Sequence, residues 1–209
     1  MEYVKEIIKL NKSIIDCKQL KFKDLTALPS GETELAFLKD HATEISAAIL
    51  DFYSQLKSYN LKWESKIKLP EKILGQVKII EPANALGDWK EIVYFEDDSP
   101  LKHFKILDQF ISEACCGFYT RQSKTGSPEL IYYYDFSNEP VSLQLTIEEY
   151  IVMMMEARGF LYWQRVLKDH LTGESSPHTY LMKQDMNKIF PEFSYDSFIT
   201  KFDTLRKAK

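Results

Sequence analysis

The chain has 209 residues, of which 44% are hydrophobic and 28% are charged, and this composition is typical of a soluble globular protein. Folding buries about 70% of the surface of a chain this long, so neither disulfides nor a metal ion is needed to stabilise it. Lysine and arginine number 27 against 31 aspartates and glutamates, which gives a net charge of −4. Nucleic-acid-binding proteins usually carry an excess of basic residues, so this charge argues against that class.

The three cysteines, Cys17, Cys115 and Cys116, form neither a C-x-x-C motif nor the even set that builds a disulfide framework. Reduced thiols of this kind are typical of cytosolic proteins. The first residues, Met1 to Glu6, lack the order of basic and then apolar residues that marks a signal peptide. The longest apolar run, from Tyr150 to Met155, has six residues, whereas a membrane-spanning helix needs about 20. We therefore expect a cytoplasmic protein that does not bind membranes.

Two helices are predicted in the first 60 residues. Residues 2–20 carry apolar side chains at helical spacing, and Leu28-Pro29-Ser30-Gly31 breaks this helix. A second helix is predicted from about Glu32 to Ser58, with an apolar stripe about 40 Å long. We expect this stripe to pack on the chain's own domain, and a coiled coil is the alternative. The residues of the stripe recur every three or four positions: Leu38, Ala42, Ile45, Ile49, Phe52 and Leu56.

Short strands are predicted in the middle of the chain. The segments with strand-like composition or alternation are 61–64, 76–81, 92–95, 104–107, 115–122, 130–136 and 141–145. Turn-forming residues at 126–128 and 138–140 separate the last three segments, which predicts an antiparallel meander.

Thr146 and Glu149 have the spacing of a capping box, in which the threonine caps a helix and the glutamate returns a hydrogen bond. The helix that begins there is predicted to run to about Leu171, to kink at Gly159 and to end at Gly173. Two shorter helices follow, about 178–190 and 195–207, separated by Pro191.

Taken together, these elements predict one α+β domain over residues 1–209. It has N-terminal helices, a central, mostly antiparallel (mixed) sheet of about six strands, and C-terminal helices.

No catalytic or metal-binding constellation stands out. The four histidines, His41, His103, His170 and His178, are scattered, and none has the spacing of a metal-ligand motif. Cys115 and Cys116 fall in a predicted strand with no nearby basic residue to activate a thiol, so we expect a buried, inert pair. The sequence therefore predicts no catalytic residue, no metal ion and no cofactor.

Acidic residues concentrate between Glu81 and Glu113, where eight acids and three lysines give a balance of −5. Within this segment Glu96, Asp97 and Asp98 precede Pro100 in a predicted turn and should be exposed. We expect these three acids, together with Asp88 and Trp89, to bind a partner. The alternative is a solvated turn that binds nothing.

Four segments carry a resemblance to a known family. They are 45–63, Gly75-Gln76-Val77-Lys78-Ile79-Ile80 with the following loop to Trp89, Leu143-Gln144-Leu145-Thr146 with Glu149-Tyr150, and Arg158-Gly159-Phe160-Leu161-Tyr162-Trp163-Gln164. In this order and spacing they resemble the SUKH superfamily over about residues 30–170. One departure is that Lys57-Ser58 stands where family members often have Asn-Gly.

The SUKH superfamily includes fungal regulators of cell-wall assembly and glucan synthesis, and many bacterial immunity proteins. The resemblance implies an α+β core over about 30–170, a helical extension over 174–209, and a non-enzymatic protein that binds another protein. Bacterial members commonly neutralise a toxin, often a nuclease, and nucleases are usually basic because they bind phosphate. An acidic surface would steer such a toxin toward this chain.

We therefore expect a cytoplasmic immunity protein whose partner is a basic toxin domain. A regulatory scaffold like the fungal relatives is the alternative within binding functions. An enzyme whose site is built from residues far apart in the sequence is the alternative from another class.

Overall fold

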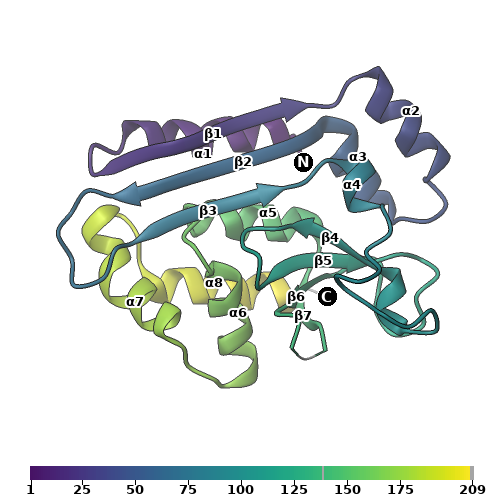
Figure 1. The fold of residues 1–209 in the computed structure, drawn as a ribbon. Coiled ribbons are helices and arrows are strands. Elements are labelled where there is room, and N and C mark those ends of the chain that lie inside the picture. Colours follow the sequence, from purple (N-terminus) through teal and green to yellow (C-terminus); the bar gives the residue numbers. More distant parts are fainter. Residues whose placement is uncertain (138, 208–209) are drawn as a thin grey trace.

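The computed structural model describes residues 1–137 and 139–207 and has an α+β fold, in which helices pack on one antiparallel sheet (Figure 1). Within those residues seven strands lie in the sheet in chain order, and each pairs with the next. The strands are β1 (Leu20–Pro29), β2 (Leu56–Ser65), β3 (Leu74–Ile79), β4 (Phe104–Asp108), β5 (Cys115–Tyr119), β6 (Ile131–Tyr134) and β7 (Val141–Leu145). The helices are α1 (Tyr3–Asp16), α2 (Glu32–Asp40), α3 (Ala47–Gln55), α4 (Pro82–Ala85), the 3₁₀ helix η1 (Pro100–His103), α5 (Ile147–Glu156), α6 (Trp163–Thr172), α7 (Pro177–Ile189) and α8 (Tyr195–Lys207).

The predicted α+β class is confirmed, with seven antiparallel strands in place of a partly mixed sheet of about six. The meander of β5, β6 and β7 and the two C-terminal helices, α7 and α8, are also confirmed. The strand predicted at 92–95 is wrong, because residues 92 and 93 lie in a turn and Tyr94 forms only an isolated bridge with Lys90. The run is apolar, as a strand would be, but no strand of the sheet lies beside it to pair with.

Strand β1 was not predicted, since its apolar residues imitate a helix. Leu20 and Phe22 alternate as a strand requires, but the register with β2 shifts between Phe22 and Asp24. This β-bulge moves the next inward-facing residues to Leu25 and Ala27, and the resulting step of three from Phe22 to Leu25 looks helical.

The long helix predicted from Glu32 to Ser58 is also wrong, because the chain leaves the helical conformation between α2 and α3. Ser46 caps α3, and its side chain accepts a hydrogen bond from the backbone N–H of Ile49 at 3.2 Å. From Leu56 onward the chain is strand β2, with Tyr59, Leu61 and Trp63 buried on one face. The apolar stripe therefore packs on the core from three separate elements.

A third long helix, predicted from Thr146 to Leu171, is divided into α5 and α6. Arg158, Gly159 and Tyr162 have φ angles of 53°, 64° and 70°, which a right-handed helix does not allow. A Cβ atom at Gly159 would lie 2.6 Å from Leu61 Cδ2, so a larger residue would also collide with β2. The predicted end is confirmed, because Gly173 caps α6 with a φ of 72°.

The predicted capping box at the start of α5 is present. The Thr146 side chain accepts a hydrogen bond from the backbone N–H of Glu149 at 3.3 Å, and the Glu149 carboxylate accepts one from the N–H of Thr146 at 2.7 Å. We expect Thr146→Ala to lower the free energy of unfolding by about 1 kcal/mol, because it leaves a helix N–H without its acceptor. Chemical denaturation of the variant measures this, and an unchanged midpoint would contradict the role of the cap.

The sheet has a weak seam between β3 and β4, defined by a single register pair, Ile79 opposite Asp108. Two backbone hydrogen bonds extend it, from Ile80 N to Leu107 O at 3.0 Å and from Gln109 N to Lys78 O at 2.9 Å. The Asp108 carboxylate adds a third by accepting from the N–H of Lys78 at 2.9 Å. This side chain thus takes the place of a backbone acceptor in the ladder.

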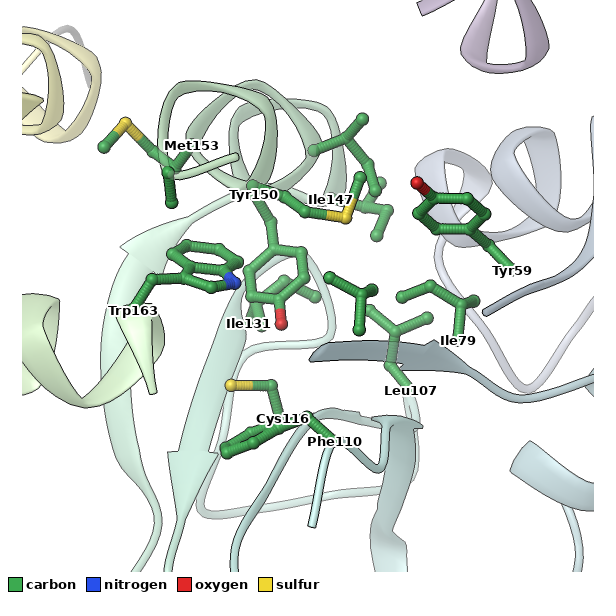
Figure 2. Close-up of a cluster of buried hydrophobic side chains, with 14 of the residues drawn as sticks. Tyr59, Ile79, Leu107, Phe110, Cys116, Ile131, Ile147, Tyr150, Met153 and Trp163 are labelled. Carbon is green, nitrogen blue, oxygen red and sulfur yellow. The ribbon is translucent and has the colours of Figure 1, made fainter. Parts of the chain in front are cut away.

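The core lies between the sheet and the helices behind it, and it includes a cluster around Tyr150 (Figure 2). The Tyr150 ring of α5 lies beside the Trp163 indole of α6, with 4.8 Å between ring centroids. Cys116 and Leu107 of the sheet lie below it in this view. Trp163 is fully buried in this cluster.

Candidate functional site

The expected partner-binding residues all lie in the connection that crosses the seam from β3 to β4, at the right of Figure 1 beyond α4. We call residues 88–98 of this connection the acidic loop. It contains all five of them, Asp88, Trp89, Glu96, Asp97 and Asp98. The loop has little regular structure, so its shape depends on hydrogen bonds and on a few buried side chains.

Side chains from both ends of the acidic loop fix its conformation. The Asp88 carboxylate accepts hydrogen bonds from the Tyr94 hydroxyl at 2.6 Å and from the backbone N–H of Lys90 at 3.1 Å. The Trp89 indole N–H donates to the carbonyl of Ala85 at 3.0 Å. Tyr94 is buried, as is the neighbouring Val93. Asp88 and Trp89 therefore stabilise the conformation of the loop, and the half-buried Trp89 ring packs against the hydrophobic core.

Two apolar side chains of the acidic loop point outward. Phe95 is 68% exposed and Ile92 is 54% exposed. Sequence reasoning missed both, because the apolar run 92–95 was interpreted as a strand. The sequence does contain a signal for Phe95, because it directly precedes Glu96, Asp97 and Asp98. A large apolar residue next to an exposed acidic turn is expected to be exposed with it.

The charges of the acidic loop are only partly neutralised. Asp97 forms an ion pair with Lys90 at 2.7 Å, and this contact lowers the pKa of Asp97. The hydrogen bond from Tyr94 lowers the pKa of Asp88, with a smaller contribution from the charges of Lys105 and Lys102. Glu96 and Asp98 are exposed and make no ion pair within residues 1–137 and 139–207. The balance of −5 along the sequence therefore overstates the free charge of the loop, which lies on Glu91, Glu96 and Asp98.

An open groove borders the acidic loop on its C-terminal side, with a volume of about 570 Å³. Its walls carry both signs of charge, so a partner surface with exposed acids and bases would fit it better than a simple anion. The groove is lined by Asp97, Asp98, Ser99, Pro100, Lys102, His103, Gln122, Lys124 and Thr125.

A buried polar cluster around Asp108 is the other chemically unusual place in the fold. The Asp108 carboxylate accepts hydrogen bonds from the Tyr150 hydroxyl at 2.8 Å and from Gln164 Nε2 at 2.9 Å. Burial raises the pKa of Asp108 to about 6, partly offset by these hydrogen bonds. Asp108, Tyr150 and Gln164 are fully buried, so no substrate reaches them, and the cluster connects structural elements.

The cysteine and histidine side chains form no metal site in the part of the chain that the structure describes. Burial raises the pKa of Cys115 and of Cys116, which matches the predicted buried, inert pair. His178 stacks on Tyr162, with 3.9 Å between ring centroids, and His170 lies 3.2 Å from the Asp203 carboxylate.

No family model, curated protein or solved structure matches the chain. Among the described residues, none of the helices combines the length and apolar character that crossing a membrane requires.

Proposed function

We propose that this chain is a non-enzymatic protein-binding module that docks a basic partner through the acidic loop. The observation that carries the proposal is the exposed Phe95, held on a loop with a fixed conformation beside the unpaired charges of Glu96 and Asp98. Aromatic side chains dominate the binding energy of many protein interfaces, and burying one contributes about 1.5–3 kcal/mol.

The sign of the free charge supports a basic partner, since complementary charge speeds association and excludes wrong partners. Together with the resemblance of the sequence to the SUKH superfamily, this favours an immunity protein that neutralises a basic toxin domain, for example a nuclease. A regulatory scaffold is the alternative, and the identity of the partner separates the two.

We expect Phe95→Ala to abolish recovery of the partner, because it removes the apolar anchor and leaves the supports of the loop in place. The measurement is affinity capture from the native organism, followed by mass spectrometry. Tyr180→Ala is the matched control, since Tyr180 is 64% exposed and its helix α7 lies on the side of the molecule away from α4 and the acidic loop (Figure 1). Equal recovery of every protein by the parent, Phe95→Ala and Tyr180→Ala would refute the docking role of the loop.

A second prediction concerns Glu96, Asp97 and Asp98. Neutralising all three as Gln, Asn and Asn should lower the association rate with the captured partner more than it raises the dissociation rate. The effect should shrink as salt shortens the Debye length from about 10 Å at 0.1 M to about 3 Å at 1 M. Association kinetics at the two salt concentrations measure it.

Asp97→Asn is the internal control for this experiment, since the charge of Asp97 is already paired with Lys90. It should change the association rate much less than Glu96→Gln with Asp98→Asn. Stability should be nearly unaffected in all these variants, because exposed charges contribute little to it. Identical rates for the triple variant and the parent would exclude these three charges from steering and leave the exposed Glu91, Ile92 and Phe95 as candidates in the loop.

A further inference from the structure

The outer edge of strand β1 is free along nearly its whole length. β1 is the first strand of the sheet, with α1 packed behind it (Figure 1). Within the described residues, the backbone from Lys21 to Pro29 makes no hydrogen bond outside its ladder with β2. An edge of this kind presents a row of unpaired N–H and C=O groups to any extended chain that approaches it.

Apolar side chains surround this edge. Phe22 and Leu28 of β1 are exposed, and Leu25 and Ala27 are only half-buried. Helix α1 adds Ile8 and Ile15, which are exposed and lie on one side of the helix because they are seven residues apart. Of the ten large exposed hydrophobic residues in the described part of the chain, four therefore belong to α1 and β1.

The same end of the sheet is basic. β1 carries Lys21, Lys23 and one acid, Asp24, and residues 61–80, which include β3 and half of β2, contain five lysines and two glutamates. Three lysines share the Glu64 carboxylate, which lies 3.9 Å from Lys21, 3.4 Å from Lys23 and 2.9 Å from Lys72. A single acid does not neutralise three bases, and the exposed Lys62 and Lys78 make no ion pair within the described residues.

We propose that β1 binds an extended acidic segment of a partner protein, which adds to the sheet as an eighth strand. Main-chain hydrogen bonds to the regular part of β1, from Asp24 to Leu28, would hold the segment. Because side chains alternate between the two faces of a strand, its apolar residues face Leu25, Ala27 and α1. Its acidic residues face Lys21, Lys23 and Lys62. This inference is independent of the acidic loop.

The features of β1 that favour an acidic strand disfavour a second copy of the chain. Two copies that pair antiparallel over this stretch would place Asp24 of one copy opposite Leu28 of the other and would give Lys21 and Lys23 no acid opposite them. The bulge between Phe22 and Asp24, together with Pro29, also shortens the stretch available for self-pairing. An acidic strand needs only the short regular stretch, and the lysines attract it.

The test uses a ten-residue peptide in which glutamate alternates with valine, labelled for fluorescence anisotropy. We expect saturable binding to the full chain, with new protection of β1 backbone amides in hydrogen exchange. Two further peptides are methylated on the backbone nitrogens of all valines or of all glutamates. Since alternate N–H groups of a strand point to the same side, one of these peptides should lose binding at least tenfold and the other should keep it.

Matched variants distinguish binding at the edge of β1 from non-specific electrostatic attraction to the protein. Lys21→Glu with Lys23→Glu should weaken binding at least tenfold, whereas Lys39→Glu with Lys201→Glu makes the same charge change on α2 and α8 and should have little effect. Phe95→Ala should not change peptide binding, so failure of strand addition at β1 can be distinguished from failure of the proposed role of the acidic loop.

Two results would overturn strand addition in favour of unspecific binding of polyanions. They are equal binding of both methylated peptides and equal competition by a single-stranded oligothymidylate. Dimers of the parent chain in sedimentation that dissociate in Leu28→Glu, which places an acid opposite Asp24 of the second copy, would assign the edge to a second copy instead.

Discussion

Asp108→Asn is expected to raise the free energy of unfolding at neutral pH by about 3 kcal/mol. Burial without a neighbouring cation raises the pKa of Asp108 from its ordinary 3.8 to about 6. A difference of about 2 units corresponds to about 3 kcal/mol of destabilisation whenever the carboxylate is ionised. Asparagine keeps an acceptor for the N–H of Lys78 and carries no charge. The Gln164 amide can rotate so that Oε1, which lacks a partner in the described residues, accepts the new N–H.

The pH dependence follows from the direction of this shift. Since the folded state binds the Asp108 proton more tightly than the unfolded state, this group increases stability as the pH falls from about 6 toward 4. Above about 6 the stabilisation is lost. Asp108→Asn should therefore be more stable than the parent at pH 7.5 and nearly equal to it at pH 4.

Urea denaturation of parent and variant at five pH values measures the difference between them. The comparison cancels carboxylates whose pKa is lowered by ion pairs, such as Glu34 beside Lys57, because both proteins contain them. Parallel stability curves across this range would contradict a buried, uncompensated charge at Asp108.

Trp163→Ala should lower the free energy of unfolding by about 3–5 kcal/mol, which threatens a domain of ordinary stability. The indole is fully buried and packs on Tyr150, so its removal leaves a cavity in the cluster that joins α5, α6 and the sheet. Thermal and urea denaturation measure the loss.

Trp163→Phe is the informative comparison. The buried indole N–H has no hydrogen-bond partner within the described residues, and phenylalanine removes that unpaired donor together with part of the ring. We expect the loss for this variant to stay well below the loss for Trp163→Ala. Unchanged stability of Trp163→Ala would contradict the role of the indole in the core.

Local signals predicted those elements whose ends are marked by the sequence itself. The capping box at Thr146, the αL cap at Gly173 and the β5–β7 meander are present, while the turn predicted at 138–140 includes residue 138, which lies outside the described residues. The helix predicted over 32–58 failed because its break at Ser46 carries no glycine or proline, whereas the kink predicted at Gly159 is a complete break between α5 and α6. Strand β1 failed because its bulge at Phe22–Asp24 disguises the alternation, and a bulge is visible only in the paired strand.

The candidate site was predicted at the level of the segment and not at the level of the side chain. Charge along the sequence located residues 88–98, but pairing decides which charges are free, and the partners of Asp88 and Asp97 are fixed by the fold of the loop. Exposure of Phe95 depends on the turn conformation, which the apolar run at 92–95 concealed.

The seam between β3 and β4 has a consequence for how this chain can diversify. A connection that crosses a seam with a single register pair can change in length and sequence without disturbing the ladders on either side. The acidic loop lies in this connection, while α5 couples the two halves of the molecule through its contacts with α1 and α3 on one side and with β7 and α8 on the other. Under the proposed function, recognition falls to the exposed side chains of the acidic loop. A lineage could exchange one partner for another by remodelling these side chains, while selection on stability retains the buried Ala85, Val93 and Tyr94 of the same connection.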